Sequence, residues 1–131
     1  MGNTLLEIGT IHLRRQAPSA AAEVLMRVKE LGRSSHRLHR ALAEALMMQE
    51  KYEEAIAELH CALKLKADVA EDHYRLGIAL DRLGNYDKAV EALKKAIELE
   101  PREVVYHQSL GFTYESIGRR KDAIKCFKRA L

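Results

Sequence analysis

Three histidines spaced 34 residues apart, His39, His73 and His107, are the residues of this sequence that most resemble metal ligands. Imidazole is a common ligand of zinc. A period of this length is typical of stacked helical repeats, in which equivalent side chains of neighbouring copies lie on the order of 10 Å apart. That distance is too long for them to share one ion. We therefore predict that these histidines are packed side chains that bind no metal. If they are buried in the neutral form, acidification should cause a mild loss of stability.

Residue combinations typical of enzymes are missing from the sequence. It has no glycine-rich phosphate loop, no nucleophile elbow and no cluster of His and Cys ligands. The acidic pairs Glu53-Glu54 and Glu71-Asp72 are predicted to begin helices, where negative charge is favourable. We therefore expect a protein with no catalytic residues, no metal and no cofactor.

The histidine spacing belongs to a repeat that covers the whole chain. Four copies begin at Gly2, His36, Ala70 and Val104, with no insertion between them. A small residue occupies the eighth and the twentieth position of every copy. These residues are Gly9, Ala43, Gly77 and Gly111, and Ala21, Ala55, Ala89 and Ala123. A fixed period in this range predicts a solenoid of stacked supersecondary units.

Residues 70–103 show the repeating unit most clearly. Leucine and alanine recur at helical spacing over about 71–82, which predicts a first helix. Gly84 is expected to end that helix, because glycine readily adopts a positive φ. Gly77 and Ala89 have almost no side chain, so the two helices of the unit are predicted to cross closely there. A lone hairpin leaves its apolar face uncovered, and the copies must therefore stack.

This pattern resembles the tetratricopeptide repeat (TPR) family over essentially the whole chain. The residues that carry the resemblance in the third copy are Leu76, Gly77, Leu80, Gly84, Tyr86, Ala89, Leu93, Ala96 and Pro101. The resemblance implies an all-α fold, a right-handed α-solenoid of four helix–turn–helix repeats in a single domain, 1–131. The repeats are 2–35, 36–69, 70–103 and 104–131, the last of them truncated.

The copies differ in how well they match the family. The first departs most, with His12 at an aromatic position and Arg33 where the third copy has a proline. Pro18 can still begin a helix and Gly32 can still end one, so a hairpin is expected there too. The last two copies resemble the MamA family of TPR scaffolds that coat magnetosomes. That resemblance lies in residues 75–81 and 112–119.

Composition agrees with a packed protein and excludes other classes. The chain has 131 residues, 47% of them hydrophobic, and a net charge of +3, which is small for a protein that binds nucleic acid through its overall charge. No apolar run approaches the roughly 20 residues that cross a bilayer, and the N-terminus lacks a signal peptide. Cys61 and Cys126 lie in non-adjacent copies, too far apart for a disulfide. We expect a soluble, cytoplasmic protein with free thiols.

In TPR proteins the first helices of the repeats line a concave face, so the resemblance implies a partner-binding groove there. Apolar residues bordered by arginines in these columns favour a protein or peptide ligand with acidic and apolar residues. The candidate binding residues are Leu6, Arg37, Arg40, Glu44, Met47, Tyr74, Ile78, Arg82, Gln108 and Phe112. The clamp with which some TPR proteins grip the acidic tail of Hsp70 or Hsp90 is not expected, because Glu44 or Glu71 would repel a carboxylate in it.

Two alternative functions stay open at this point. The last copy stops at Leu131 with no polar closing helix, so either the sequence is a fragment of a longer repeat array or another chain covers that end. The second alternative predicts a self-associating scaffold, a homo-oligomer formed through an uncapped C-terminal edge. The final helix, 119–131, carries six basic residues against the single acid Asp122, a pattern that suits acidic protein, lipid headgroups or nucleic acid. No aromatic residues alternate with these charges to stack on bases, which argues against nucleic acid.

Overall fold

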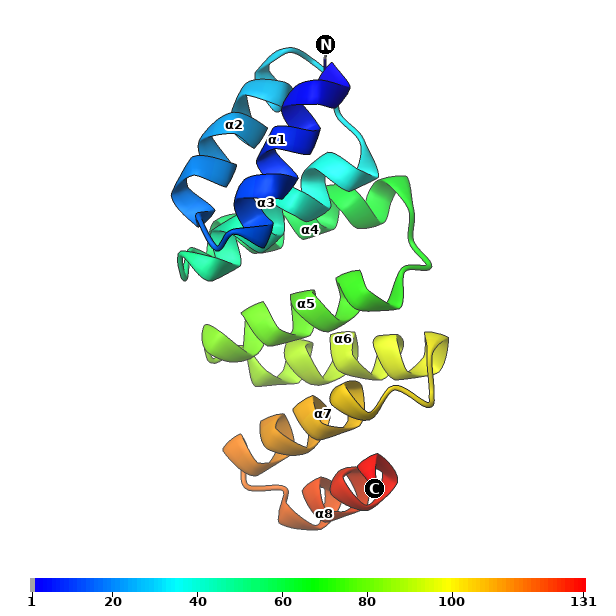
Figure 1. Ribbon diagram of the computed structural model, residues 1–131. Helices are drawn as coiled ribbons and strands as arrows, with labels where there is room; N and C mark the ends of the chain where they lie inside the picture. Colours follow the sequence, from blue (N-terminus) through cyan, green and yellow to red (C-terminus); the bar gives the residue numbers. More distant parts are fainter. Residues whose placement is uncertain (1) are drawn as a thin grey trace. The chain divides into compact units, whose positions relative to one another are not determined.

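The computed structural model describes residues 2–131, and their side chains from Leu5 onward. These residues form eight α-helices and no β-strand (Figure 1). The helices are α1 (Gly2–Arg14), α2 (Pro18–Glu30), α3 (His36–Met48), α4 (Tyr52–Leu65), α5 (Ala70–Arg82), α6 (Tyr86–Leu99), α7 (Val104–Ser116) and α8 (Arg120–Ala130). The all-α fold predicted from the sequence is confirmed.

The helices pair in chain order into four hairpins, α1 with α2, α3 with α4, α5 with α6 and α7 with α8 (Figure 1). The first helices of these hairpins begin at Gly2, His36, Ala70 and Val104. These are the first residues of the four predicted repeats. One period of the sequence therefore corresponds to one hairpin.

Two hairpins make up each of two compact units, Met1–Ala67 and Asp68–Leu131. In the first unit α3 packs against both α1 and α2. In the second unit α7 packs in the same way against both α5 and α6. Within each unit, the first helix of the later hairpin thus covers both helices of the earlier one, which is the stacking expected of an α-solenoid.

In the first, third and fourth copies the paired helices cross closely at the glycine in the eighth position, and the second copy has the small residue Ala43 there. A Cβ atom added to Gly77 would lie 2.7 Å from Cγ of Leu93 and 3.3 Å from the carbonyl oxygen of Ala89, both on the partner helix α6. A Cβ on Gly9 would lie 2.6 Å from Cγ of Leu25 on α2. These distances are shorter than van der Waals contact, so the glycine hydrogen is what allows the leucine to fit. The predicted crossing is confirmed.

The turn inside each hairpin has the same backbone conformation in all four copies. The fifteenth residue has a positive φ, which is 80° at Gly84 and 79° at Gly118. Gln16 and Glu50 occupy this position in the first two copies with φ of 56° and 60°. A side chain in this region costs about 1–2 kcal/mol relative to glycine, so the first two turns are strained. The predicted helix end at Gly84 is confirmed.

Each unit has its own apolar core, to which both hairpins contribute. In the first unit Leu25, Leu38 and Leu42 are fully buried and pack together. In the second unit Leu93 is fully buried beside Leu110. Burying a leucine side chain contributes about 1.5–3 kcal/mol, so these contacts between hairpins supply most of the stacking energy.

The first copy forms its hairpin despite its departures from the family pattern. Pro18 is the first residue of α2, where a missing backbone N–H costs nothing, and Gly32 follows the helix with a φ of 75°. Both cysteines, Cys61 and Cys126, are free thiols, as predicted. None of the helices formed by residues 2–131 is both long enough and apolar enough to span a bilayer.

Replacing Gly77 by leucine should force α5 and α6 apart, because the new side chain occupies the space of Leu93. We expect the free energy of unfolding to fall by about 1–3 kcal/mol or more. Chemical denaturation followed by circular dichroism measures this change. Glu91→Leu, at an exposed position of α6, is the matched control and should have little effect. Equal stability of Gly77→Leu and the parent protein would mean that the crossing is misplaced.

Candidate partner-binding site

A pocket of about 370 Å³ opens between α1 and α3 in the first unit. We call it the α1–α3 pocket. Its lining residues are Thr10, Leu13, Arg14, Arg37, Arg40, Ala41 and Glu44. Three guanidinium groups against one carboxylate give the pocket a net positive charge, and guanidinium groups suit bidentate binding of a carboxylate. The structure therefore brings together three predicted binding residues, Arg37, Arg40 and Glu44, and adds Arg14.

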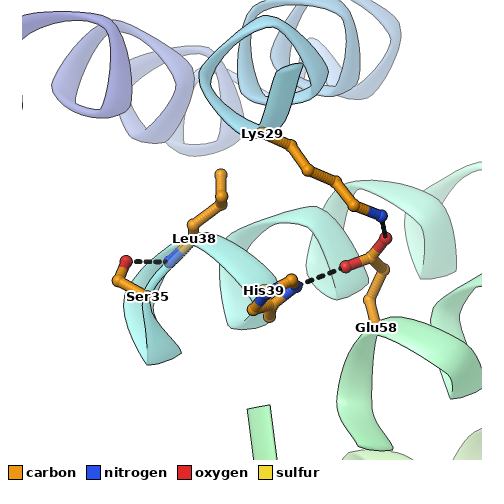
Figure 2. A network of polar contacts seen from close by, with 5 residues as sticks. All are labelled: Lys29, Ser35, Leu38, His39 and Glu58. Atoms are coloured by element: carbon orange, nitrogen blue, oxygen red, sulfur yellow. Dashed lines mark hydrogen bonds and ion pairs between the residues drawn. The ribbon is translucent and has the colours of Figure 1, made fainter. Parts of the chain in front are cut away.

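The helix that carries Arg37 and Arg40 is tied to its neighbours by a buried polar network (Figure 2). Glu58 of α4 is at its centre. Its Oε2 lies 2.6 Å from Nδ1 of His39 on α3, and its Oε1 accepts a 2.6 Å hydrogen bond from Nζ of Lys29 on α2. Three helices of the first unit are thus joined at one carboxylate.

The same network shifts the pKa values of two of its members. Burial acts to raise the pKa of Glu58, but hydrogen bonds and charge from Lys29 and His39 together outweigh it and hold the pKa below 4.5. The hydrogen bond to Glu58 raises the pKa of Lys29 above 10.5, against the opposing effect of burial. Both partners are therefore charged over a wide pH range, as an ion pair requires.

Sequence reasoning missed this network, although one signal for it was present. Glu58 occupies the twenty-third position of its copy, where the other copies have Val24, Ala92 and Cys126. A lone carboxylate in an otherwise apolar column needs a buried partner. His39, itself 5% exposed, is that partner.

Two apolar residues of the predicted set in the first unit are less accessible than expected. Leu6 is 7% exposed and packs in the core with Leu38 and Leu42, so the expectation that it lies uncovered is wrong. It is covered because α3 packs over α1. Met47 on α3 is half-buried.

In the second unit, Tyr74 and Ile78 of α5 are half-buried. The ring of Tyr74 stacks at a tilt on Tyr106 of α7, with 5.0 Å between centroids and 33° between the planes. Tyr74 also packs against the core, so it contributes to stability as well as to the surface. If Tyr74 were truncated, weaker binding could therefore result from lost packing rather than from a lost contact with the partner.

The remaining predicted residues of the second unit, Arg82, Gln108 and Phe112, are exposed. Phe112 is 60% exposed, which is unusual for such a large apolar side chain. Its ring meets Phe127 of α8 edge-on, with 5.2 Å between centroids and an interplanar angle of 64°. The contact holds the ring on one side while leaving most of it accessible to solvent.

The histidines at the fourth position are packed side chains, as predicted. His39 and His107 are buried, and His73 is half-buried. Nε2 of His107 donates a 2.7 Å hydrogen bond to the carbonyl oxygen of Pro101. Among the described residues, no group of three or more His, Cys, Asp or Glu side chains is arranged to hold a metal ion.

Replacing Glu58 by glutamine removes the charge that Lys29 and His39 share. We expect the free energy of unfolding near neutral pH to fall by about 1–3 kcal/mol, because two polar partners lose a buried carboxylate. Since the pKa of folded Glu58 is below 4.5, the ionised form stabilises the fold above pH 4.5, and this contribution disappears as pH falls through the folded-state pKa. Urea unfolding should show a parent–variant difference that shrinks in acid. If the parent and the variant differed in stability by the same amount near neutral pH and in acid, this account would be contradicted.

Models of the tetratricopeptide repeat match this chain in three stretches, residues 6–70, 70–103 and 105–131. The middle stretch coincides with the third copy identified from the sequence. A comparison with curated protein sequences gives no match.

Solved structures of MamA are similar to this chain over almost its full length. A crystal structure of MamA shares 35% of its residues with this chain at a TM-score of 0.94, and the match covers 99% of this chain and 76% of that one. MamA 41-end from Desulfovibrio magneticus RS-1 is 25% identical at a TM-score of 0.96, over 99% of this chain and 73% of that one. The MamA-like resemblance and the α-solenoid fold predicted from the sequence are confirmed.

A TPR scaffold is typically non-enzymatic, and the repeats together with these neighbours indicate a role in protein interaction or as a scaffold. The three matched stretches extend from residue 6 to residue 131 with one residue between the last two of them. The chain belongs to the tetratricopeptide repeat family.

Proposed function

We propose that this chain is a cytoplasmic, non-enzymatic module that binds a protein or peptide segment through the faces formed by its first helices. The ligand carries both acidic and apolar residues. The observation that carries this proposal is the α1–α3 pocket, in which Arg14, Arg37 and Arg40 surround one hollow.

The chemistry of the α1–α3 pocket supports an acidic ligand group. A guanidinium group can donate two parallel hydrogen bonds to a carboxylate, and three of them outnumber the single acid Glu44. The polar network at Glu58 holds α3 against α2 and α4, so Arg37 and Arg40 project from a helix that is already fixed. A fixed site loses less conformational entropy on binding.

The second unit has an accessible apolar surface of its own. Phe112 presents most of its ring, and Ile78 is partly accessible. Apolar side chains of a bound segment would remove this surface from water, which contributes about 25 cal/mol per Å². A partner with acidic residues alone would leave Phe112 uncovered.

The test compares partner capture by the parent protein with capture by Arg37→Glu and Phe112→Ala. Proteins that co-elute from a lysate are quantified by mass spectrometry. We expect each variant to recover the main partner about tenfold less, as for a residue that contributes strongly to binding. Phe112→Ala should change the melting temperature little, because its ring contact with Phe127 contributes only about 0.5–1.5 kcal/mol.

Arg120→Glu is the matched control, since it reverses one exposed charge on α8, the second helix of its hairpin. It should capture the partner as the parent protein does. If Arg37→Glu and Phe112→Ala also capture the partner normally, the proposed binding faces are wrong.

A second candidate is a self-associating scaffold. The observation that favours it is the 35% identity to a MamA structure across 99% of this chain, together with the scaffold role that the MamA resemblance implies. Light scattering over a series of concentrations separates the two candidates. A mass that grows with concentration supports assembly, whereas one monomeric species at high concentration removes this candidate.

A further inference from the structure

The first unit has a second hollow, apart from the α1–α3 pocket. A hollow of about 410 Å³ opens there between α2 and α4. We call it the α2–α4 hollow. Its apolar lining consists of Ala22, Met26, Leu46 and Ala57. The volume falls within the roughly 300–1,000 Å³ of typical ligand pockets.

The hollow exists because two lining residues are smaller than their counterparts in the second unit. Ala22 corresponds to Val90 one unit later, 68 residues on, and Leu46 corresponds in the same way to Tyr114. Both Val90 and Tyr114 are buried, and the Tyr114 ring is covered by the guanidinium of Arg119 at 4.9 Å. The second unit thus places larger side chains, one of them capped by a cation, at the equivalent positions.

At the edge of the α2–α4 hollow, two more positions carry residues that differ in chemistry between the first and the second unit. Met26 is 41% exposed and Ala57 is also exposed. The corresponding residues of the second unit are Lys94 and Lys125, both exposed. The first unit therefore has an apolar rim where the second has two ammonium groups.

The charged residues around the α2–α4 hollow are mainly acidic. Glu23 and Glu54 are exposed and take part in no ion pair of the described structure, and Lys51 is the one basic residue of the lining. Glu58 also lines the hollow, but Lys29 and His39 already bind both of its oxygens (Figure 2). With Glu58 neutralised by its partners, the two carboxylates of Glu23 and Glu54 outnumber the single ammonium of Lys51, so a ligand meets a net negative charge.

The walls of the α2–α4 hollow are held in place before any ligand arrives. Nε2 of Gln49 donates hydrogen bonds of 3.3 Å to the carbonyl oxygens of Pro18 on α2 and Ala45 on α3. At the other end, Lys29 on α2 is bonded to Glu58 on α4 at 2.6 Å. A preformed apolar site avoids much of the ordering cost of binding.

We infer that the α2–α4 hollow is a second docking site, for a partner segment that inserts one side chain the size of leucine or methionine and carries lysine or arginine beside it. The apolar side chain fills the space between Ala22, Met26 and Leu46. The neighbouring cation pairs with Glu23 or Glu54. This site goes beyond the proposed function, because its ligand has the opposite charge to the one that suits the α1–α3 pocket.

The test is an NMR titration of the full chain, with labelled methyl groups, by a synthetic nonapeptide of alternating leucine and lysine. We expect the methyl signals of Ala22, Met26 and Ala57 to shift. The matched variant Met26→Lys/Ala57→Lys installs the residues of the second unit at two exposed positions. It should keep the fold and weaken binding about tenfold or more, because it covers the hollow and repels the peptide.

Two controls separate this site from the α1–α3 pocket and from non-specific attraction. Arg37→Glu should bind the peptide with unchanged affinity. A peptide with glutamate in place of lysine should bind about fivefold more weakly or worse, as expected for the loss of two exposed ion pairs. Equal binding to Met26→Lys/Ala57→Lys, shifts confined to α1 and α3, or no shift at saturating peptide would each overturn the inference.

Discussion

The fold depends on a missing side chain. In three of the four hairpins a glycine faces a large apolar residue of the partner helix where the helices cross: Gly9 faces Leu25, Gly77 faces Leu93 and Gly111 faces Phe127. The other hairpin has Ala43 at this position. At Gly9 and Gly77 the partner leucine occupies the space that a Cβ would take, and Leu25 and Leu93 are fully buried. Each closely packed hairpin then offers an apolar face that the next helix covers. The stacking within each unit, and the surfaces that it leaves accessible, follow from this contact.

The two units use the same backbone for different chemistry. The first joins its helices through a carboxylate, Glu58, whereas the second has Cys126 at that position and packs aromatic rings such as Tyr74 and Tyr106. The first unit consequently presents an arginine-lined pocket and an apolar hollow with acidic edges. The second unit presents the exposed ring of Phe112. Repeats that share a period can therefore contribute different binding surfaces to one chain.

The sequence predicts the hairpins well, because the signals that define them are local and recur. The starts of all four first helices and the crossing at Gly77 are visible as repeated columns, and Gly84 alone predicts that α5 ends shortly before it. The accessible surface was harder to predict, because it depends on contacts between hairpins. Leu6 occupies a column expected to face a partner, yet α3 covers it. The network at Glu58 joins three helices, and the column of Glu58 shows only that a buried partner is needed, without showing which helices supply it.

The most direct test of the central claim is a double-mutant cycle between Gly77→Ala and Leu93→Ala, followed by equilibrium unfolding. The added Cβ should destabilise the parent protein, because it would lie 2.7 Å from Cγ of Leu93. Once that Cγ is removed, the same alanine should be neutral or stabilising, since alanine favours helix over glycine by about 1 kcal/mol. We predict a coupling free energy of about 1 kcal/mol or more. If the changes in unfolding free energy of the two single variants summed to that of the double variant within about 0.5 kcal/mol, the account would be contradicted.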